Sequence, residues 1–557
     1  MHKPHTFILV LALAWCCRVP AQQSLTPHLS SLLPLSPSEE RYHTVNADLS
    51  LKSTAVLYAN PVFTHWRSQN DTTSHHRTAI VYAGVGGGDA KGDFIPYEGN
   101  GATDYRVGAY GEYTTLRSGT LSGNIQYAQG KHRNIGWSGT RLPELYAPYF
   151  STDSCGGDFK FESYFAEGNY GFSLQRWTLG VKGSFYGEQA YRLTDPRALN
   201  NTTWLRFNAG AAHEMGSHLL MLDVGYGRNK QHMQLRYWRP GQQDRFFVCY
   251  GFGLYDTRQS GVSFGKSRMY YIDEYNARLQ YLSPQDEPLR LHASLSYAYD
   301  HMKTEESDIY NLYESRSHHF CPMLCLTYAH QSHWLFHLLT EADINRRRGY
   351  ENIIEEYLID KENNIYDFRT IDTRQNYSRS TDRMRIALIA ARQMGSVQLA
   401  LQGGFTASHY EEKYTAGDYR VSVKKLTPHA KASVEWAGRA DGIALSLLYA
   451  HQGVGNHVYD VYMQNQQIAH LDFQQTFAPY AFRCANLHYA LANLTWQHHF
   501  KKVSVGMSAK FYLAQGERLQ DVSYTGTIGF PSTAPMISPE PDKHRERWCN
   551  ITASITF

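Results

Sequence analysis

The sequence predicts an all-β protein: a closed antiparallel transmembrane β-barrel of about eighteen strands, with roughly sixteen to twenty compatible with the pattern. Three observations favour this fold. Segments of about ten residues alternate between apolar and polar side chains, which is the length and pattern of a tilted membrane strand. Short polar turns alternate with long connections along the chain. Beyond the N-terminus, no apolar run approaches the ~18 residues that a membrane helix needs.

Residues 1–21 have the three-part pattern of a secretory signal peptide. A short basic start precedes an apolar run, and Val19 and Ala21 occupy the positions that signal peptidase reads. A lipoprotein signal is the alternative because two cysteines end the apolar run, but Trp15 stands where a lipobox needs a small residue. We therefore predict cleavage after Ala21, export, and location in the outer membrane of a Gram-negative cell.

Residues 22–70 are predicted to form a periplasmic or lumen-filling segment. They contain the strand-like stretch "STAVLYANPVF" (53–63). Counting it as a barrel strand would make the strand number odd and would place the N-terminus outside, which is unusual for a bacterial barrel. The barrel is therefore expected to occupy residues 71–557, with its first strand near residue 77.

The strands are predicted from two-faced segments. "LRLHASLSYAYD" (289–300) places Leu, Ala and Tyr on one face and Arg, His, Ser and Asp on the other. The C-terminal "CNITASITF" (549–557) alternates in the same way. Inside lipid every backbone N–H and C=O needs a partner, so a sheet must close on itself there. The apolar faces are therefore expected to contact lipid and the polar faces to line the lumen.

The connections are expected to place the two ends of the barrel on opposite sides of the membrane. Short turns such as 283–288 and 392–396 are expected in the periplasm, and long loops outside the cell. The glycine-rich "GVGGGDAKGD" (84–93) lacks the ending of a phosphate-binding loop and is expected in an outer loop. The long stretches are 128–158, 227–268, 343–383, 453–484 and 514–545.

Ionisable side chains on the polar strand faces are the candidate lumen-lining residues. They can tune the selectivity of a watery pore, or they can neutralise one another and close the lumen. Both possibilities stay open from sequence. The residues are Arg290, His292, Asp300, His337, Glu341, Arg385, His429, Lys431, Glu435 and Lys510.

Metal, cofactor and catalytic sites are not expected. None of the 27 histidines has another two residues away, the spacing that puts two rings on one strand face, and no HExxH motif is present. His457 and His470 share one predicted outer loop and could converge there. Cys155 and Cys249 can pair in an exported protein, or they are isolated buried or lipid-facing thiols. The chain is therefore not expected to be an enzyme.

Nucleic acid is not expected as a partner. The chain has 54 basic and 51 acidic residues, a formal net charge of +3, and so no global electrostatic attraction to an acidic polymer. Aromatic residues make up 14% of the chain, led by 41 tyrosines. Such amphipathic side chains suit a protein that contacts outer-membrane lipid and lipopolysaccharide.

Two stretches, "YAPYFSTDSCGGDFKFESYFAEG" (146–168) and "AYRLTDPRALNNTTW" (190–204), and the terminal strand ending in Phe557 resemble an uncharacterised family of Bacteroidota outer-membrane barrels. The resemblance implies an outer-membrane location and a single barrel, and it supplies no substrate or catalytic residues. The terminal aromatic looks like the signature that the barrel-assembly machinery recognises, so this machinery is an expected partner. "YANPVF" (58–63) is faintly similar to the Asn-Pro-Ala of FadL-type channels, whose N-terminal hatch plugs the lumen, although Val62 replaces the alanine and a plain Asn-Pro turn is the alternative.

The expected function is uptake or passage of a small solute, alone or as accessory to a TonB-dependent system. A TonB-dependent transporter or a surface lipoprotein would then be the partner. The chain lacks a separate plug domain of about 100 residues before its first strand, which argues against its being such a transporter itself. The alternatives are a surface-exposed structural or adhesin barrel and, less favoured, an outer-membrane hydrolase.

Overall fold

A computed structural model describes residues 35, 37–46, 49–70, 77–115, 118–153, 155–236, 238, 246–256, 267–306, 311–329, 333–363, 365–461, 476–524 and 537–557. The predicted signal peptide and His470 lie outside these residues.

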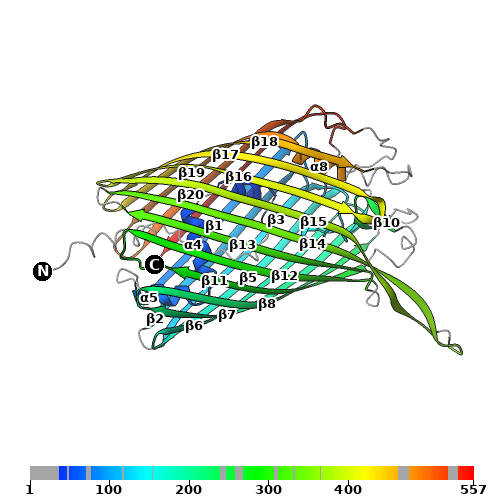
Figure 1. The fold of residues 1–557 in the computed structure, drawn as a ribbon, viewed down its shortest axis with the longest axis horizontal. Helices are drawn as coiled ribbons and strands as arrows, with labels where there is room; N and C mark the ends of the chain where they lie inside the picture. Colours follow the sequence, from blue (N-terminus) through cyan, green and yellow to red (C-terminus); the bar gives the residue numbers. More distant parts are fainter. Residues whose placement is uncertain are drawn as a thin grey trace.

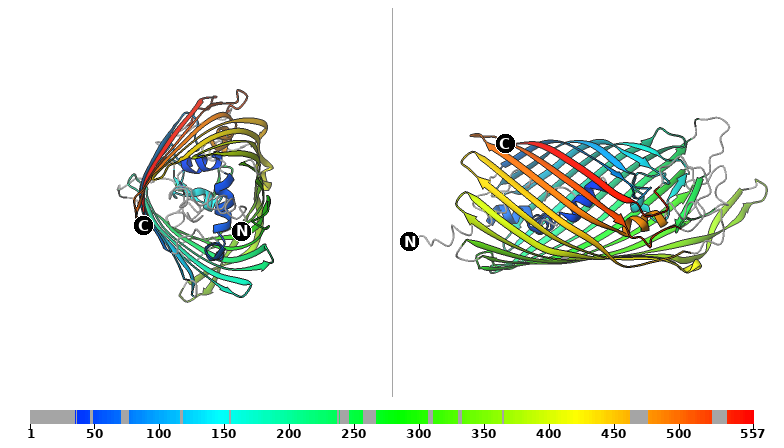
Figure 2. Two further views of the ribbon diagram at one scale, coloured as in Figure 1. Left: turned by 90° about the vertical axis from the view of Figure 1, so that its left-hand side faces the viewer. Right: turned by 90° about the horizontal axis from the view of Figure 1, so that it is seen from above.

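Eighteen antiparallel strands close into one barrel (Figures 1 and 2). The first strand pairs with both the second and the last, so that Val81 lies opposite Ala109 on one side and Ile555 on the other. The closed fold, the strand number and the first strand at Arg77 are as the sequence predicts. The strands are β1 (Arg77–Lys91), β2 (Gly101–Thr115), β3 (Gly119–Ile135), β5 (Gly157–Leu174), β6 (Trp177–Arg192), β7 (Arg197–Met215), β8 (His218–Arg236), β11 (Ser267–Leu282), β12 (Leu289–Glu306), β13 (Tyr313–Ala329), β14 (Trp334–Asp360), β15 (Ile365–Met394), β16 (Val397–Tyr414), β17 (Tyr419–Ala437), β18 (Asp441–Asp460), β19 (Ala485–His499), β20 (Ser504–Arg518) and β21 (Lys543–Thr556).

The alternation in sequence separates the outside of the barrel from its inside. On β12, Leu289 is 59% exposed and Leu295 42%, whereas His292 and Ser294 are buried. Ile551 on β21 is exposed in the same way. Because apolar side chains stand out along the wall while polar ones point inward, the outer surface suits hydrocarbon.

The two ends of the barrel differ. Short turns close one end, as between β5 and β6 at residues 175–176. At the other end the stretch 343–383, expected to be a loop, is a β-hairpin that continues β14 and β15 beyond the rest of the wall (Figure 1). Most of the glycine-rich stretch 84–93, also expected in an outer loop, belongs to β1. The neighbouring strand β21 leaves no room for a side chain at Gly88, where a Cβ would lie 2.6 Å from the carbonyl oxygen of Arg547.

Three short helices lie inside the barrel: α3 (Pro37–Val45), α4 (Leu49–Tyr58) and α5 (Phe63–Asn70) (Figure 2). We call residues 37–70 the lumen segment; residues 47–48 within it are outside the described part. The strand-like stretch 53–63 is the end of α4, a turn and the start of α5, and it is not a strand of the barrel. None of the described helices is both long and apolar enough to cross a membrane.

The long connections also fold into the barrel. They form α6 (Pro143–Tyr146), α8 (Ala478–Arg483) and a separate three-stranded sheet of β4 (Ser151–Asp153), β9 (Phe246–Gly251) and β10 (Leu254–Asp256). The short turn η2 (Thr415–Gly417) joins β16 to β17 and is exposed. Tyr146 and Tyr149 pack in one buried cluster with Phe159 and Tyr270 of the wall. The end of the lumen opposite the short turns is therefore also occupied.

Candidate functional site

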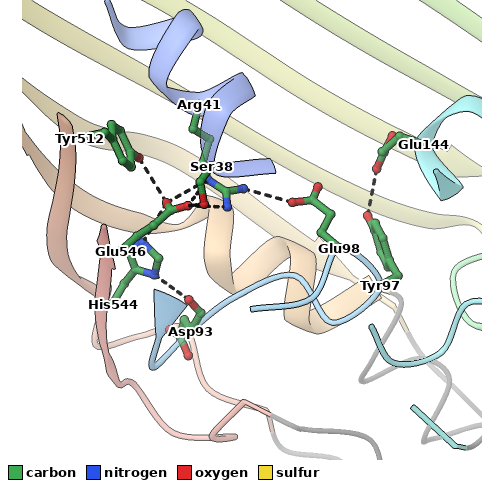
Figure 3. Close-up of polar contacts among 9 residues, drawn as sticks. All are labelled: Ser38, Arg41, Asp93, Tyr97, Glu98, Glu144, Tyr512, His544 and Glu546. Atoms are coloured by element: carbon green, nitrogen blue, oxygen red, sulfur yellow. Dashed lines mark hydrogen bonds and ion pairs between the residues drawn. The ribbon is translucent and has the colours of Figure 1, made fainter. Parts of the chain in front are cut away.

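The lumen segment contacts the barrel wall at the centre of the candidate site. Arg41 of α3 forms an ion pair of 2.7 Å with Glu546 of β21, and Ser38 donates a hydrogen bond to the same carboxylate (Figure 3). Tyr512 of β20 donates to Glu546 at 3.2 Å, and His544 lies 3.6 Å away. The carboxylate of Glu546 is fully buried and surrounded by donors, so it anchors α3 to the wall.

A second ion pair holds the same helix on the other side. Arg106 of β2 donates to Glu39 of α3 at 2.8 Å, and to Asp104 at 2.8 Å. Both carboxylates are almost completely buried, with side-chain exposures of 6% and 5%. Two wall strands therefore hold α3 through charges of opposite sign.

Helix α5 is held near the short-turn end. Arg67 donates to both oxygens of Glu112 on β2, at 2.9 and 3.1 Å. Trp66 donates to Glu214 on β7 at 2.8 Å. These two strands are separated by β3, β5 and β6, so α5 lies against the inner wall and bridges this group of neighbouring strands.

The turn between α4 and α5 packs against glycines. Asn60 donates to Gln280 of β11 at 3.0 Å. A Cβ at Gly180 would lie 2.8 Å from the carbonyl oxygen of Pro61, and one at Gly210 would lie 2.8 Å from Oδ1 of Asn60. The wall therefore has room for the Asn-Pro turn only because these positions carry no side chain.

A polar connection joins the lumen segment to the outer loops. Arg41 also pairs with Glu98 at 3.1 Å, in the connection between β1 and β2. The adjacent Tyr97 donates to Glu144 of α6 at 3.1 Å (Figure 3). Glu144 also accepts from Arg379 of β15 at 2.8 Å. Two neighbouring residues, Tyr97 and Glu98, therefore link α3 to α6.

The carboxyl groups of this connection differ in acidity. Burial raises the pKa of Glu98 to about 7, against the opposing effect of Arg41. Burial would raise the pKa of Glu144 as well, but Arg379 and Arg483 outweigh it and hold this pKa at about 2. Glu144 is thus ionised at neutral pH, whereas Glu98 exchanges a proton there.

The stretches that carry the family resemblance meet at the outer end. Arg192 donates to Asp153 at 2.6 Å and to the carbonyl oxygen of Pro196 at 2.6 Å. Both charged side chains are completely buried. Arg268 of β11 also donates to the carbonyl oxygen of Tyr149 at 3.2 Å. These motifs therefore fix the inward fold of the loop between β3 and β5.

Four of the ten candidate lumen-lining residues take part in this arrangement. His292 shares a hydrogen bond of 2.8 Å with Ser53 of α4. The ammonium of Lys510 lies 5.9 Å from the ring centre of Tyr42 on α3.

Arg385 and Glu341 are the other two. Arg385 of β15 donates to Glu341 of β14 at 2.9 Å and to the carbonyl oxygen of Thr44 at 2.6 Å. The pair thus neutralises itself within the wall and also holds the end of α3.

The remaining six candidates lie on the wall strands, and two of them bond to neighbouring wall residues. His337 shares a hydrogen bond of 2.8 Å with Thr327, and His429 one of 3.2 Å with Gln402. The inner faces of β12 and β17 carry the other four: Arg290, Asp300, Lys431 and Glu435.

Two further predictions concern the pair Cys155 and Cys249 and the pair His457 and His470. No disulfide joins Cys155 and Cys249. His457 lies 2.8 Å from the hydroxyl of Tyr480 and 3.3 Å from Asp521, while its proposed partner His470 is outside the described residues.

Sequence reasoning did not identify Arg41, Arg106 or Glu546 as site residues. Arg41 and Glu39 lie two residues apart on a helix that sequence alone does not reveal. Glu546 alternates inward on β21, as Lys510 does on β20, and this signal could have identified it.

The comparison with solved structures gives low similarity throughout. The copper transporter OprC shares 9% identity over 86% of this chain and 81% of its own, with a TM-score of 0.40. A mutant of the ferric enterobactin receptor PfeA from Pseudomonas aeruginosa shares 8% identity over 86% and 81%, with a TM-score of 0.40. The FrpB iron transporter from Neisseria meningitidis shares 7% identity over 88% and 83%, with a TM-score of 0.39. No functional conclusion follows from likeness at this level.

The comparison with curated proteins finds no match. The model of one protein family matches residues 71–557, which cover every strand of the barrel. The similarity of "YANPVF" to FadL-type channels stays a prediction. The chain belongs to the family of unknown function DUF6850.

Proposed function

We propose that this protein is a gated outer-membrane channel that takes part in the uptake or passage of a small solute, and that the lumen segment is its gate. The proposal rests on the polar character of the contact between the lumen segment and the barrel wall. Helices α3 and α5 are held by ion pairs and hydrogen bonds to β2, β7 and β21.

Such a contact can open in a watery lumen. Water replaces the hydrogen bonds of polar groups when they separate, whereas an apolar core would expose its surface at a cost of about 25 cal/mol per Å². Four aromatic or aliphatic side chains of the segment are also buried, namely Tyr42, Tyr58, Val62 and Phe63. Their burial would hold the lumen segment against the wall while the channel is closed.

The connection through Glu98 and Glu144 gives the channel a way to respond from outside. A solute that displaces α6 would pull on Tyr97 and, through the adjacent Glu98, on Arg41. This arrangement suits either a channel that acts alone or one that assists a TonB-dependent transporter or a surface lipoprotein. We place the chain in the outer membrane of a Gram-negative cell, among lipid and lipopolysaccharide, after export and insertion by the barrel-assembly machinery.

Liposome swelling tests this function. Vesicles that contain the full chain should take up small sugars and amino acids slowly. Vesicles that contain a variant lacking residues 37–70 should take them up at least tenfold faster. A second variant that also replaces residues 137–152 with a short turn removes the inward loop, so that failure of both variants to admit solute would refute a channel.

A second candidate function is adhesion to a partner outside the cell. The hairpin of β14 and β15 projects from the barrel, and its tip exposes Ile359, Ile365 and Ile371 by 59, 49 and 56%. Apolar groups that gather on such a projection favour a binding surface. Replacing residues 352–372 with a short turn should abolish attachment of cells to their partner surface and leave solute uptake unchanged.

A further inference from the structure

Three side chains with different donor atoms lie together on the inner wall. His319 and Cys321 are two residues apart on β13, so they share one strand face. Asp343 is on the neighbouring strand β14. The part of the chain that the structure describes contains this one group of three side chains whose donor atoms could hold a metal ion.

The strand register explains why they meet. The ladder pairs Phe320 with Ile344 and Met323 with Glu341, which places Cys321 opposite Asp343. Opposite residues of an antiparallel pair have Cβ atoms about 5 Å apart. His319, two residues before Cys321 on the same face of β13, completes a triangle of side chains.

The donor atoms converge on one point. Nε2 of His319 lies 2.6 Å from Oδ1 of Asp343 and 3.2 Å from Sγ of Cys321. All three donor atoms lie within 4.8 Å of one another. The side chains of His319 and Asp343 are 37 and 43% exposed, so an ion in the lumen can reach them.

These separations are close to those of a tetrahedral metal site. Bond lengths of about 2.3 Å to sulfur and 2.0 Å to nitrogen place the two donors about 3.5 Å apart. The Sγ of Cys321 would have to move from His319 by only a few tenths of an ångström, and Asp343 by less than about 1 Å. Rotation of side chains that are half exposed provides such movement.

The donor set selects the kind of ion. A thiolate beside an imidazole favours zinc and similar transition metals over magnesium and calcium, which prefer oxygen alone. Three protein ligands leave one coordination position open, so the ion can exchange water or carry a further ligand.

Charges of both signs lie around the three donors. Arg383 lies opposite Asp343 in the ladder between β14 and β15 and contributes a positive charge. Asp300 of β12 lies within electrostatic range of His319, and its Oδ1 is buried with no hydrogen-bond partner among the described residues. Glu274, Arg347 and Arg206 also act on Asp300.

We propose that His319, Cys321 and Asp343 form a binding site for a divalent transition metal ion of the zinc type. The site goes beyond the proposed channel and does not depend on it, since an ion can bind inside a barrel that never opens.

Cobalt binding tests the site. The full chain, purified in detergent, reduced and stripped of metal with a chelator, is titrated with Co²⁺. We expect one Co²⁺ per chain and a near-ultraviolet absorption band from the cobalt–thiolate bond, which added Zn²⁺ removes. Cys321→Ser should abolish the band, and His319→Gln and Asp343→Asn should each weaken binding at least tenfold. Cys325→Ala is the matched control, because Cys325 lies on the same strand and should leave the band unchanged.

Two results would overturn the proposal: a wild-type protein without a cobalt–thiolate band, or a band that Cys321→Ser leaves intact. The circular dichroism of each variant shows whether the barrel has folded. Asp343→Asn keeps the shape of the side chain, so it carries the test if Cys321→Ser fails to fold. Solute uptake is not measured here, so failure of the metal site and failure of the channel are separate outcomes.

Discussion

Arg41 of α3 and Glu546 of β21 form an ion pair of 2.7 Å although they are 505 positions apart in sequence. Glu546 is completely buried, whereas Arg41 keeps 24% of its side chain exposed. A buried carboxylate is costly without its cation. The pair therefore ties the lumen segment to the strand that closes the barrel.

Arg41→Ala should loosen the lumen segment. Loss of one partner of a fully buried pair costs about 3–5 kcal/mol, and the partial exposure of Arg41 reduces this to about 1–3 kcal/mol. Hydrogen exchange of residues 37–46 should rise accordingly, and solute uptake with it. Lys543→Ala is the control, because Lys543 pairs with Glu517 at 3.6 Å with both side chains exposed, a contact worth less than about 1 kcal/mol. Equal exchange in the two variants would contradict the anchoring role of Arg41.

Gly180→Ala should displace the Asn-Pro turn. The new methyl group would lie 2.8 Å from the carbonyl oxygen of Pro61, and overpacking of this kind costs about 1–3 kcal/mol. Faster hydrogen exchange of residues 58–70 is the expected result. Gly168→Ala on the neighbouring strand should have no effect, since nothing lies within 4 Å of its Cβ position. If the amides of the turn stay protected from exchange in both Gly180→Ala and Gly168→Ala, the wall glycine does not determine the position of the turn.

The packing of α3 against the barrel wall, which we call the seated state, should weaken as the pH rises from about 4.5 to 7. Burial raises the pKa of Glu98 to about 7, so the seated state binds the proton more tightly than a state with the loop exposed. The seated state is therefore favoured below pH 4.5 and loses this stabilisation as the pH rises through the raised pKa.

Hydrogen exchange of residues 37–46 measured across this range checks the prediction, and Glu98→Gln should flatten the pH profile. Asp93, whose pKa burial raises to about 6, titrates in the same window in a neighbouring contact with Arg518. Asp93→Asn is therefore measured separately. If the pH dependence of exchange persists in Glu98→Gln and disappears in Asp93→Asn, the titrating group is Asp93 and the prediction for Glu98 is wrong.

Asp153→Asn should destabilise the outer loop strongly. It would leave the fully buried Arg192 without its carboxylate, at a cost of about 3–5 kcal/mol. A lower midpoint of thermal unfolding and faster cleavage of residues 136–156 by protease are expected. Arg197→Ala removes a neighbouring pair with Asp195 in which the arginine is 41% exposed, and should change stability by less than about 1 kcal/mol. Comparable losses in both variants would argue against a special role for the buried pair.

The barrel could be predicted from sequence because its signal is local and repeated. A two-residue period shows in each strand without knowledge of its neighbours, as in β12 and β21, and a closed sheet follows from the need to satisfy backbone groups in lipid. The hairpin at 343–383 was missed because its exposed part, outside lipid, has little apolar alternation to mark it as strand.

The site was predicted less completely because it depends on contacts between distant segments. Alternation predicts an inner-face position for Arg385 and Lys510, but their contacts with Thr44 and Tyr42 depend on the path of the lumen segment. Likewise, a pattern of two histidines at strand spacing does not include His319 and Cys321, which have that spacing with mixed donors. Their partner Asp343 is set by strand register, which no local pattern gives.

Single-channel recording in planar bilayers tests the central claim that the lumen segment gates the barrel. The full chain should give small or rare conductance steps, and the variant that lacks residues 37–70 should give large, stable steps. Arg41→Ala should lie between them, with more frequent openings. Conductance of the full chain equal to that of the deletion variant would contradict the claim.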